Sequence, residues 1–85
     1  MITEILKFSA DWCSPCKKLE EELKNFDTIP IFNINIEEDK DNMASKYHIR
    51  SIPTLIYLDN NKNEVHRTIG FINIKSINDI INKFK

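Results

Sequence analysis

The apolar pattern of this chain changes from strand-like to helix-like at Cys13. Residues 2–8 form a short apolar run, which predicts a β-strand that ends in a loop. After Cys13 the apolar side chains recur at steps of three and four residues, as on one face of a helix. They are Cys16, Leu19, Leu23 and Phe26. The sequence therefore predicts a strand and then a helix that begins at Cys13 and ends near Asp27.

The middle of the chain contains three more strand patterns and one weaker helix pattern. Residues 30–36 alternate between polar and apolar side chains, which predicts a strand. A short helix is expected over residues 37–47. Residues 54–58 and 64–69 favour strands, and the Asn- and Asp-containing segment between them is typical of a turn, so they predict a hairpin that ends at Gly70.

The C-terminal segment predicts a last helix. Asn73 can cap its N-terminus, with Ile72 and Ile77 as a hydrophobic staple, and Ser76 is a competing cap. The expected buried stripe contains Ile77, Ile80, Ile81 and Phe84.

These elements follow the order βαβαββα, which predicts one α/β domain over residues 1–85. The first two strands are joined through a helix, so they should be parallel with a right-handed crossover. The last two strands should be antiparallel. A mixed sheet is therefore expected.

Composition narrows the partners and the compartment. The formal net charge is −1, with no basic stripe for nucleic acid. The N-terminus carries charges at Glu4 and Lys7, and no long apolar stretch predicts a signal peptide or a membrane span. We therefore expect a cytoplasmic protein with no nucleic-acid or membrane partner. In a reducing cytosol a close cysteine pair is more often catalytic or metal-binding than a permanent staple.

The chain has two cysteines, Cys13 and Cys16, and three interpretations compete for them. A structural zinc site needs four ligands, and only His48 and His66 could join the two thiolates. A static disulfide across so short a loop stabilises little in the chain-entropy model. A redox-active dithiol is the third interpretation, and the residues favour it.

A redox role follows from the place of the pair at a strand-to-helix junction. The unpaired N–H groups and the dipole of the helix N-terminus favour a thiolate at Cys13. Cys16 is expected one turn further in and less exposed. Pro15 suits the first helical turn because it lacks the N–H that would have no partner there.

Three stretches resemble the thioredoxin family. Residues 8–17, F-S-A-D-W-C-S-P-C-K, are similar to its active-site segment, with Ser14 where glycine is commoner. Residues 46–55, K-Y-H-I-R-S-I-P-T-L, resemble its cis-proline loop, and Gly70 is the third match. The resemblance implies a minimal thioredoxin-like fold, with a four-stranded mixed sheet of order 2-1-3-4 flanked by three helices.

The same resemblance implies roles for site residues. Cys13 would attack a substrate disulfide and Cys16 would resolve the mixed disulfide. A cis Pro53 would bring the backbone of Ile52 beside Cys13 for pairing with substrate, with Trp12 as an apolar wall and Gly70 nearby. Lys17 follows the second cysteine as in the family and would tune the site or be a solvated helix residue.

Lys7 departs from the family pattern. Thioredoxins usually have a buried aspartate at this position and a lysine partner on the next strand, which aligns roughly with Asn33 here. We hypothesise that Lys7 lies under Cys16 and lowers its pKa or serves as a basic group; the alternative is that its amine reaches solvent and does nothing specific. His48 and His66 are expected to be a loop residue and a surface residue.

The leading function is a thioredoxin-like protein-disulfide reductase with no bound cofactor, whose electrons come from a thioredoxin reductase or another donor. Disulfide-containing proteins, such as ribonucleotide reductase or a peroxidase, are the expected substrates of what should be a monomer. A glutaredoxin is the alternative, although residues 71–74 lack the Gly- and Asp-containing turn that many glutaredoxins use for glutathione. A non-catalytic partner-binding subunit is a further alternative.

Overall fold

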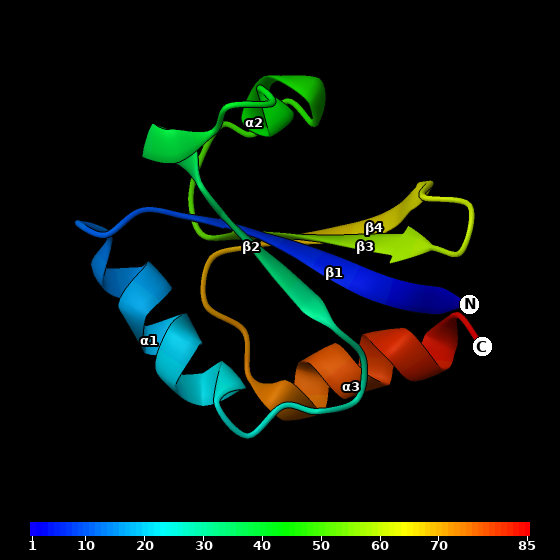
Figure 1. The fold of residues 1–85 in the computed structure, drawn as a ribbon. Coiled ribbons are helices and arrows are strands. Elements are labelled where there is room, and N and C mark those ends of the chain that lie inside the picture. The colour runs from blue at the N-terminus through cyan, green and yellow to red at the C-terminus, as the bar shows by residue number, and fades with distance from the viewer.

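A four-stranded mixed sheet forms the centre of the protein. The computed structural model describes residues 1–85, and its strand order is β2-β1-β3-β4 (Figure 1). The strands are β1 (Ile2–Ser9), β2 (Ile31–Asn35), β3 (Thr54–Asp59) and β4 (Glu64–Ile69). The β1–β2 pair is parallel, whereas the β1–β3 and β3–β4 pairs are antiparallel. The predicted order 2-1-3-4 and the predicted hairpin are therefore confirmed.

Three helices cover the two faces of this sheet. Helices α1 (Ser14–Leu23) and α3 (Ile74–Lys83) lie on one face, and the one-turn helix α2 (Met43–Lys46) lies on the other (Figure 1). A 3₁₀ turn, η1 (Ile36–Glu38), follows β2. None of these helices has the length and apolar character needed to cross a bilayer.

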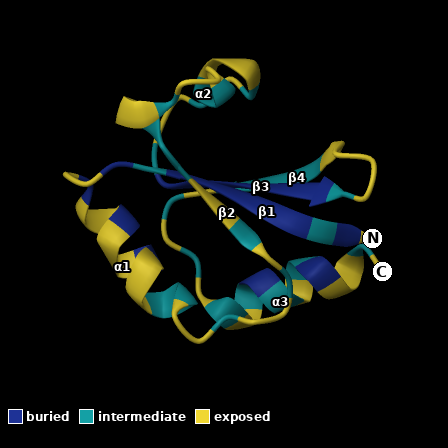
Figure 2. Ribbon diagram, viewed as in Figure 1, coloured by how far each residue is buried: buried dark blue, intermediate teal, exposed yellow.

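The alternation of side chains along β1 builds a separate core on each face. Ile5 is fully buried with Leu19 of α1 and with Ile77 of α3. Its neighbours Leu6 and Phe8 point to the opposite core, under α2. The central strands β1 and β3 are the most buried elements (Figure 2). This period of two is what a strand imposes, and it fixes which β1 side chains face α1.

Helix α1 ends at Leu23, four residues before the predicted end at Asp27. The N–H of Lys24 donates to the carbonyl of Glu21, and the N–H of Phe26 donates to that of Leu23. These i→i−3 bonds tighten the chain out of the α-helix. Phe26 still packs on the core. The helical spacing of apolar residues therefore extends beyond the end of the helix, which is why the predicted end was too late.

The predicted helix over residues 37–47 is wrong in extent. It is divided into η1 and α2, because the Asp39 carboxylate accepts hydrogen bonds from the N–H groups of Met43 (2.8 Å) and Ala44 (2.7 Å). This side chain competes with the helical backbone and starts a new turn there. Asn42 adopts the left-handed conformation, with φ of 53°.

The last helix follows its prediction. Asn73 is the N-cap of α3, and its side chain accepts a hydrogen bond of 2.9 Å from the Ser76 N–H. Ile77 and Ile81 are buried, while Ile80 and Phe84 are half-buried at the edge of the same core. The competing cap, Ser76, is therefore inside the helix.

Candidate active site

The two cysteines lie at the N-terminus of α1 and form a disulfide. Cys13 is the N-cap of the helix, and its Sγ accepts a hydrogen bond of 3.2 Å from the Cys16 N–H. Their Cα atoms are 5.2 Å apart, well within the range that a disulfide spans. Pro15 lies in the first turn, as predicted. In the reduced protein the same N–H and the helix dipole would stabilise negative charge on Cys13.

Both cysteines are nearly inaccessible in this oxidised state. Cys13 is 5% exposed and Cys16 is 3% exposed, and both pack in a small apolar cluster with Ala10. The expected contrast in exposure between them is therefore very small. Ile36 and Ile52 pack against the same cluster.

The Pro53 loop and the end of β4 meet next to this cluster. The Ile52–Pro53 peptide bond is cis, and the Gly70 N–H donates a hydrogen bond of 2.8 Å to the Pro53 carbonyl. Gly70 has φ of 88°, and a Cβ there would meet no atom within 4 Å. The positive φ, rather than crowding, is therefore what favours glycine at this position.

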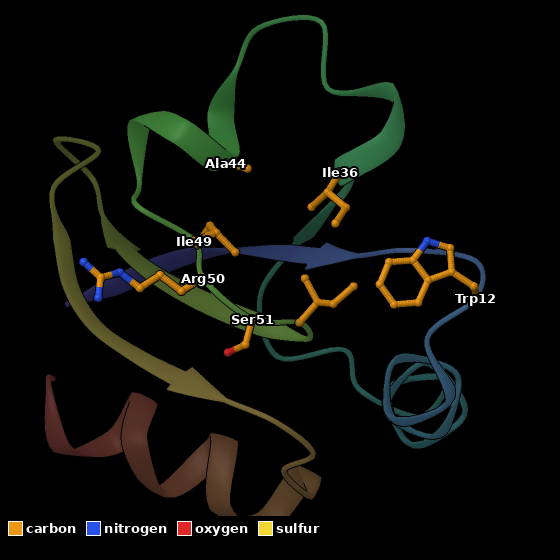
Figure 3. A pocket seen from close by; sticks show the side chains of 7 residues that line it. Trp12, Ile36, Ala44, Ile49, Arg50 and Ser51 are labelled. Atoms are coloured by element: carbon orange, nitrogen blue, oxygen red, sulfur yellow. The ribbon is translucent and has the colours of Figure 1, made fainter.

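An apolar groove of about 340 Å³ opens above the cysteine cluster. Trp12 stands at one end and Arg50 at the other, with Ile36, Ala44 and Ile49 between them (Figure 3). Ser51 and Ile52 complete the lining. Trp12 is 65% exposed, so its indole is an unusually open apolar surface. Because Ile36 and Ile52 line the groove and also pack against the cysteine cluster, the groove borders the cluster that holds the disulfide.

Lys7 lies buried in β1 on the face that α1 covers, since it is two residues from Ile5 in the strand. Its register partners are Asn33 of β2 and Leu55 of β3, and the resemblance to thioredoxins had implied Asn33. Burial lowers the pKa of the Lys7 amine from its ordinary value, and the negative charge of Glu20 opposes that shift. A pocket lined only by polar and charged residues opens beside it.

Three other candidates lie outside the lining of the groove. Lys17 is exposed on α1 and takes part in no ion pair. His48 is exposed in the left-handed conformation, with φ of 54°, and does not line the groove. The expected surface position of His66 is wrong, because its ring is half-buried between those of Tyr57 and Phe84, at centroid distances of 5.5 and 5.8 Å.

The zinc interpretation lacks a ligand set. No group of three or more His, Cys, Asp or Glu side chains is arranged to hold a metal ion, whereas structural zinc needs four ligands.

The sequence reasoning did not identify Ile36, Ala44, Ile49 or Arg50 as part of the site. Ile36 follows β2 and Ala44 lies in α2, so their approach to Trp12 depends on how η1 and α2 fold back over the sheet. The one available signal was that β2 is parallel to β1, because the C-terminal ends of parallel strands meet at one edge.

A Cys-x-x-Cys disulfide at the N-terminus of a helix, on a mixed sheet of this order, defines the class of dithiol–disulfide proteins. The thioredoxin family model matches residues 2–83. The chain is 37% identical over 83 residues to a thioredoxin of Chlamydia pneumoniae, covering 93% of this chain and 79% of that protein. It is 32% identical over 81 residues to a thioredoxin of Bacillus subtilis, with coverages of 89% and 76%.

Solved structures give the same answer for the fold. A malaria parasite thioredoxin-2, described as a component of protein secretion machinery, superposes with a TM-score of 0.82 at 26% identity, covering 96% of this chain and 84% of that one. A mutant thioredoxin from Halobacterium salinarum gives 0.81 at 26% identity, with coverages of 95% and 73%.

The chain belongs to the thioredoxin family. With the Cys13–Cys16 pair in place, it is a thiol–disulfide oxidoreductase that acts as a protein-disulfide reductase. Membership implies, in general terms, disulfide-containing substrates and a reductase that returns electrons.

Proposed function

We propose that Cys13 is the attacking thiolate and Cys16 the resolving thiol of this reductase. The observation that supports this order is the hydrogen bond from the Cys16 N–H to the Cys13 Sγ at the start of α1. It stabilises negative charge on Cys13, while Cys16 lies inside the first turn with its backbone donor already used.

The reaction then balances in two exchanges. The Cys13 thiolate attacks one sulfur of a substrate disulfide, the substrate S–S bond breaks, and the other substrate sulfur leaves as a thiolate that takes up a proton. Cys16 loses its proton and attacks the Cys13 sulfur. The second substrate thiol is released and the Cys13–Cys16 disulfide remains, so two electrons have passed to the substrate.

We propose that the apolar groove and the Pro53 loop hold an extended substrate segment with apolar residues near its cysteine. Ile52 takes part in none of the backbone hydrogen bonds outside the helices and strands, so its N–H and carbonyl are free to pair with such a segment. Trp12 would cover one side of this segment, and Gly70 would leave room for it beside Pro53. Pro15 and Lys17 complete the proposed site, as residues that shape or tune the first turn.

Electrons would come from an external reductase, with no bound cofactor, and the protein would act as a cytoplasmic monomer on protein disulfides such as those of ribonucleotide reductase or a peroxidase. Pro15 between the cysteines is typical of reducing rather than oxidising relatives. We therefore expect a potential near that of thioredoxins, about −270 mV, rather than the strongly oxidising end near about −120 mV.

The test is reduction of insulin disulfides with two electron supplies compared in parallel. Turnover with NADPH and a thioredoxin reductase, and none with glutathione and glutathione reductase, would support the proposal. Turnover with glutathione alone would support the glutaredoxin alternative, and a potential above about −180 mV would contradict the reducing role.

The groove gives a separate prediction about substrate recognition. Trp12→Ala and Ile36→Ala are each expected to raise KM for a protein disulfide about tenfold, since each removes buried apolar contact in the complex. Reduction of a small soluble disulfide should change less than about twofold, because such a substrate does not fill the groove.

Phe32→Ala is the matched control for these variants. Phe32 is also apolar and 51% exposed, but it lies on β2 outside the groove. KM should not change in this variant. An equal rise in all three variants would mean that general surface hydrophobicity, not the groove, binds the substrate.

A further inference from the structure

A second pocket, lined only by polar and charged residues, opens between β1, β2 and α1. It has a volume of about 350 Å³ and is lined by Lys7, Ser9, Asp11, Glu20, Asn33 and Asn35. Lys7 is buried, whereas Asp11, Glu20 and Asn33 are exposed. The pocket therefore connects a buried amine to solvent. The two thiol–disulfide exchanges use none of these side chains.

The walls of this pocket adjoin the cysteine cluster on several sides. Ser9 and Asp11 flank Ala10, which packs in that cluster. Asn35 precedes Ile36, which touches the cluster from β2. Glu20 lies one helical turn after Cys16, on the same side of α1. Lys7 lies on the face of β1 that α1 covers, and Cys16 is a buried residue of α1, so both belong to the interface between α1 and the sheet.

The charges around Lys7 come from two elements only. Glu20 of α1 and Asp11 of the loop before it line the pocket, while β2 contributes only the neutral Asn33 and Asn35. The β3 neighbour, Leu55, is apolar. Lys7 is thus the one cation of the pocket, and no salt bridge or hydrogen bond ties its amine to a carboxylate.

We propose that Lys7 is a positioning residue for the second exchange: its ammonium group favours the thiolate form of Cys16, and the polar pocket conducts the Cys16 proton to solvent. This inference rests on the proposed resolving role of Cys16. In the mixed disulfide, the Cys16 S–H bond breaks, its proton leaves through the pocket water, and its electron pair forms the bond to Cys13. The released substrate thiolate takes up a proton from solvent, so the protons balance.

The charge of Lys7 should act strongly on the Cys16 thiol because of where it lies. A charge in a partly buried site is screened much less than one on the open surface. A nearby cation favours the charged form of a thiol. Glu20 opposes Lys7, since its negative charge acts on Cys16 with the other sign. Removing the positive charge of Lys7 should therefore raise the Cys16 pKa, and removing the negative charge of Glu20 should lower it.

The decisive measurement is the titration of Cys16 alone, in a Cys13→Ser background, followed through the ultraviolet absorbance of the thiolate. Lys7→Met keeps the length and apolar stem of the side chain. It is expected to raise the Cys16 pKa by about one unit, which reduces the thiolate about tenfold at neutral pH. Lys7→Arg should retain the original titration, and Glu20→Gln should lower the pKa.

Lys24→Met is the matched control, because it removes an equal charge from an exposed lysine at the far end of α1. Its titration should equal that of the parent protein. If Lys7→Met and Lys24→Met give the same Cys16 pKa in folded proteins, Lys7 is merely a solvated lysine and the proposal is overturned. A titration that Lys7→Arg does not restore would overturn it too.

The rate of the second exchange gives an independent readout. With Cys13 held as a mixed disulfide to a chromophoric thiol, release of that thiol should be about tenfold slower in Lys7→Met at neutral pH. Burial lowers the pKa of Lys7 from its ordinary value, so its ammonium charge is lost at a lower pH than the charge of an exposed lysine. The difference from the parent should therefore vanish at high pH.

Neither measurement requires reductase turnover. If the protein failed to reduce insulin, the proposed function would be wrong, but the Cys16 titration would still test the role of Lys7. If the protein reduced insulin normally but the Cys16 pKa did not change in Lys7→Met, only the inference about Lys7 would be wrong.

Discussion

Replacing Cys13 with serine is expected to reduce insulin-disulfide reduction to the uncatalysed background. A serine hydroxyl is not ionised at neutral pH, and no base lies within hydrogen-bonding distance to activate it: the one hydrogen bond of the Cys13 Sγ comes from a backbone N–H. Cys16 is not expected to replace it as the attacking group, because it lies inside the first turn of α1 and its Sγ lacks an N–H donor like the one that the Cys13 Sγ has. The measurement is the initial rate with a saturating external reductant.

The matched variant is Cys16→Ser, which should allow Cys13 to attack the substrate disulfide but prevent resolution of the mixed disulfide. Cys13 can still form a mixed disulfide, but no second thiol releases the substrate, so turnover should stop while a covalent complex accumulates. Proteins caught in this way from a lysate, and released by excess dithiol, would identify the substrates. If both serine variants keep the biological role of the protein, the non-catalytic alternative is correct for that role.

The sequence predicted the cysteine pair and its helix because local rules decide both. Cys13 follows a strand pattern and begins a helical one, and Pro15 is compatible only with the first turn of that helix. The sheet order required the resemblance to thioredoxins, since a crossover rule specifies which strands are parallel but not where each lies. The sequence also suggested that Lys7 and Asn33 lie side by side, and the β1–β2 register places them so.

The groove and the polar pocket could not be predicted in the same way. Asp39 divides the expected helix by accepting hydrogen bonds from two backbone N–H groups, and the short helix that follows brings Ala44 into the lining of the groove. Such a competition between a side chain and the helical backbone is nearly balanced in free energy, so periodicity does not decide it. The polar pocket needs the β1–β2 register and the rotation of α1 together, because Glu20 must come to lie over Lys7.

Replacing Leu19 with alanine is expected to cause the largest loss of stability on α1. Leu19 has no exposed surface, and Cys16 is the only other buried residue of this helix. Removing its side chain should cost about 2–5 kcal/mol, since the transfer free energy is lost and a cavity remains between α1 and the sheet. Domains of this kind have a total stability of about 5–15 kcal/mol, so much of it would be lost.

Leu23→Ala, made on the same helix, shows whether burial is the cause. Leu23 is half-buried at the end of α1, so the same chemical change there should cost only about 1 kcal/mol. Alanine favours helices at least as well as leucine, so a loss at either position measures packing rather than helix propensity. Guanidinium unfolding of the oxidised proteins measures both, with an unchanged m-value expected. Equal losses of stability in the two variants would mean that burial of Leu19 is not the main packing contact between α1 and the sheet.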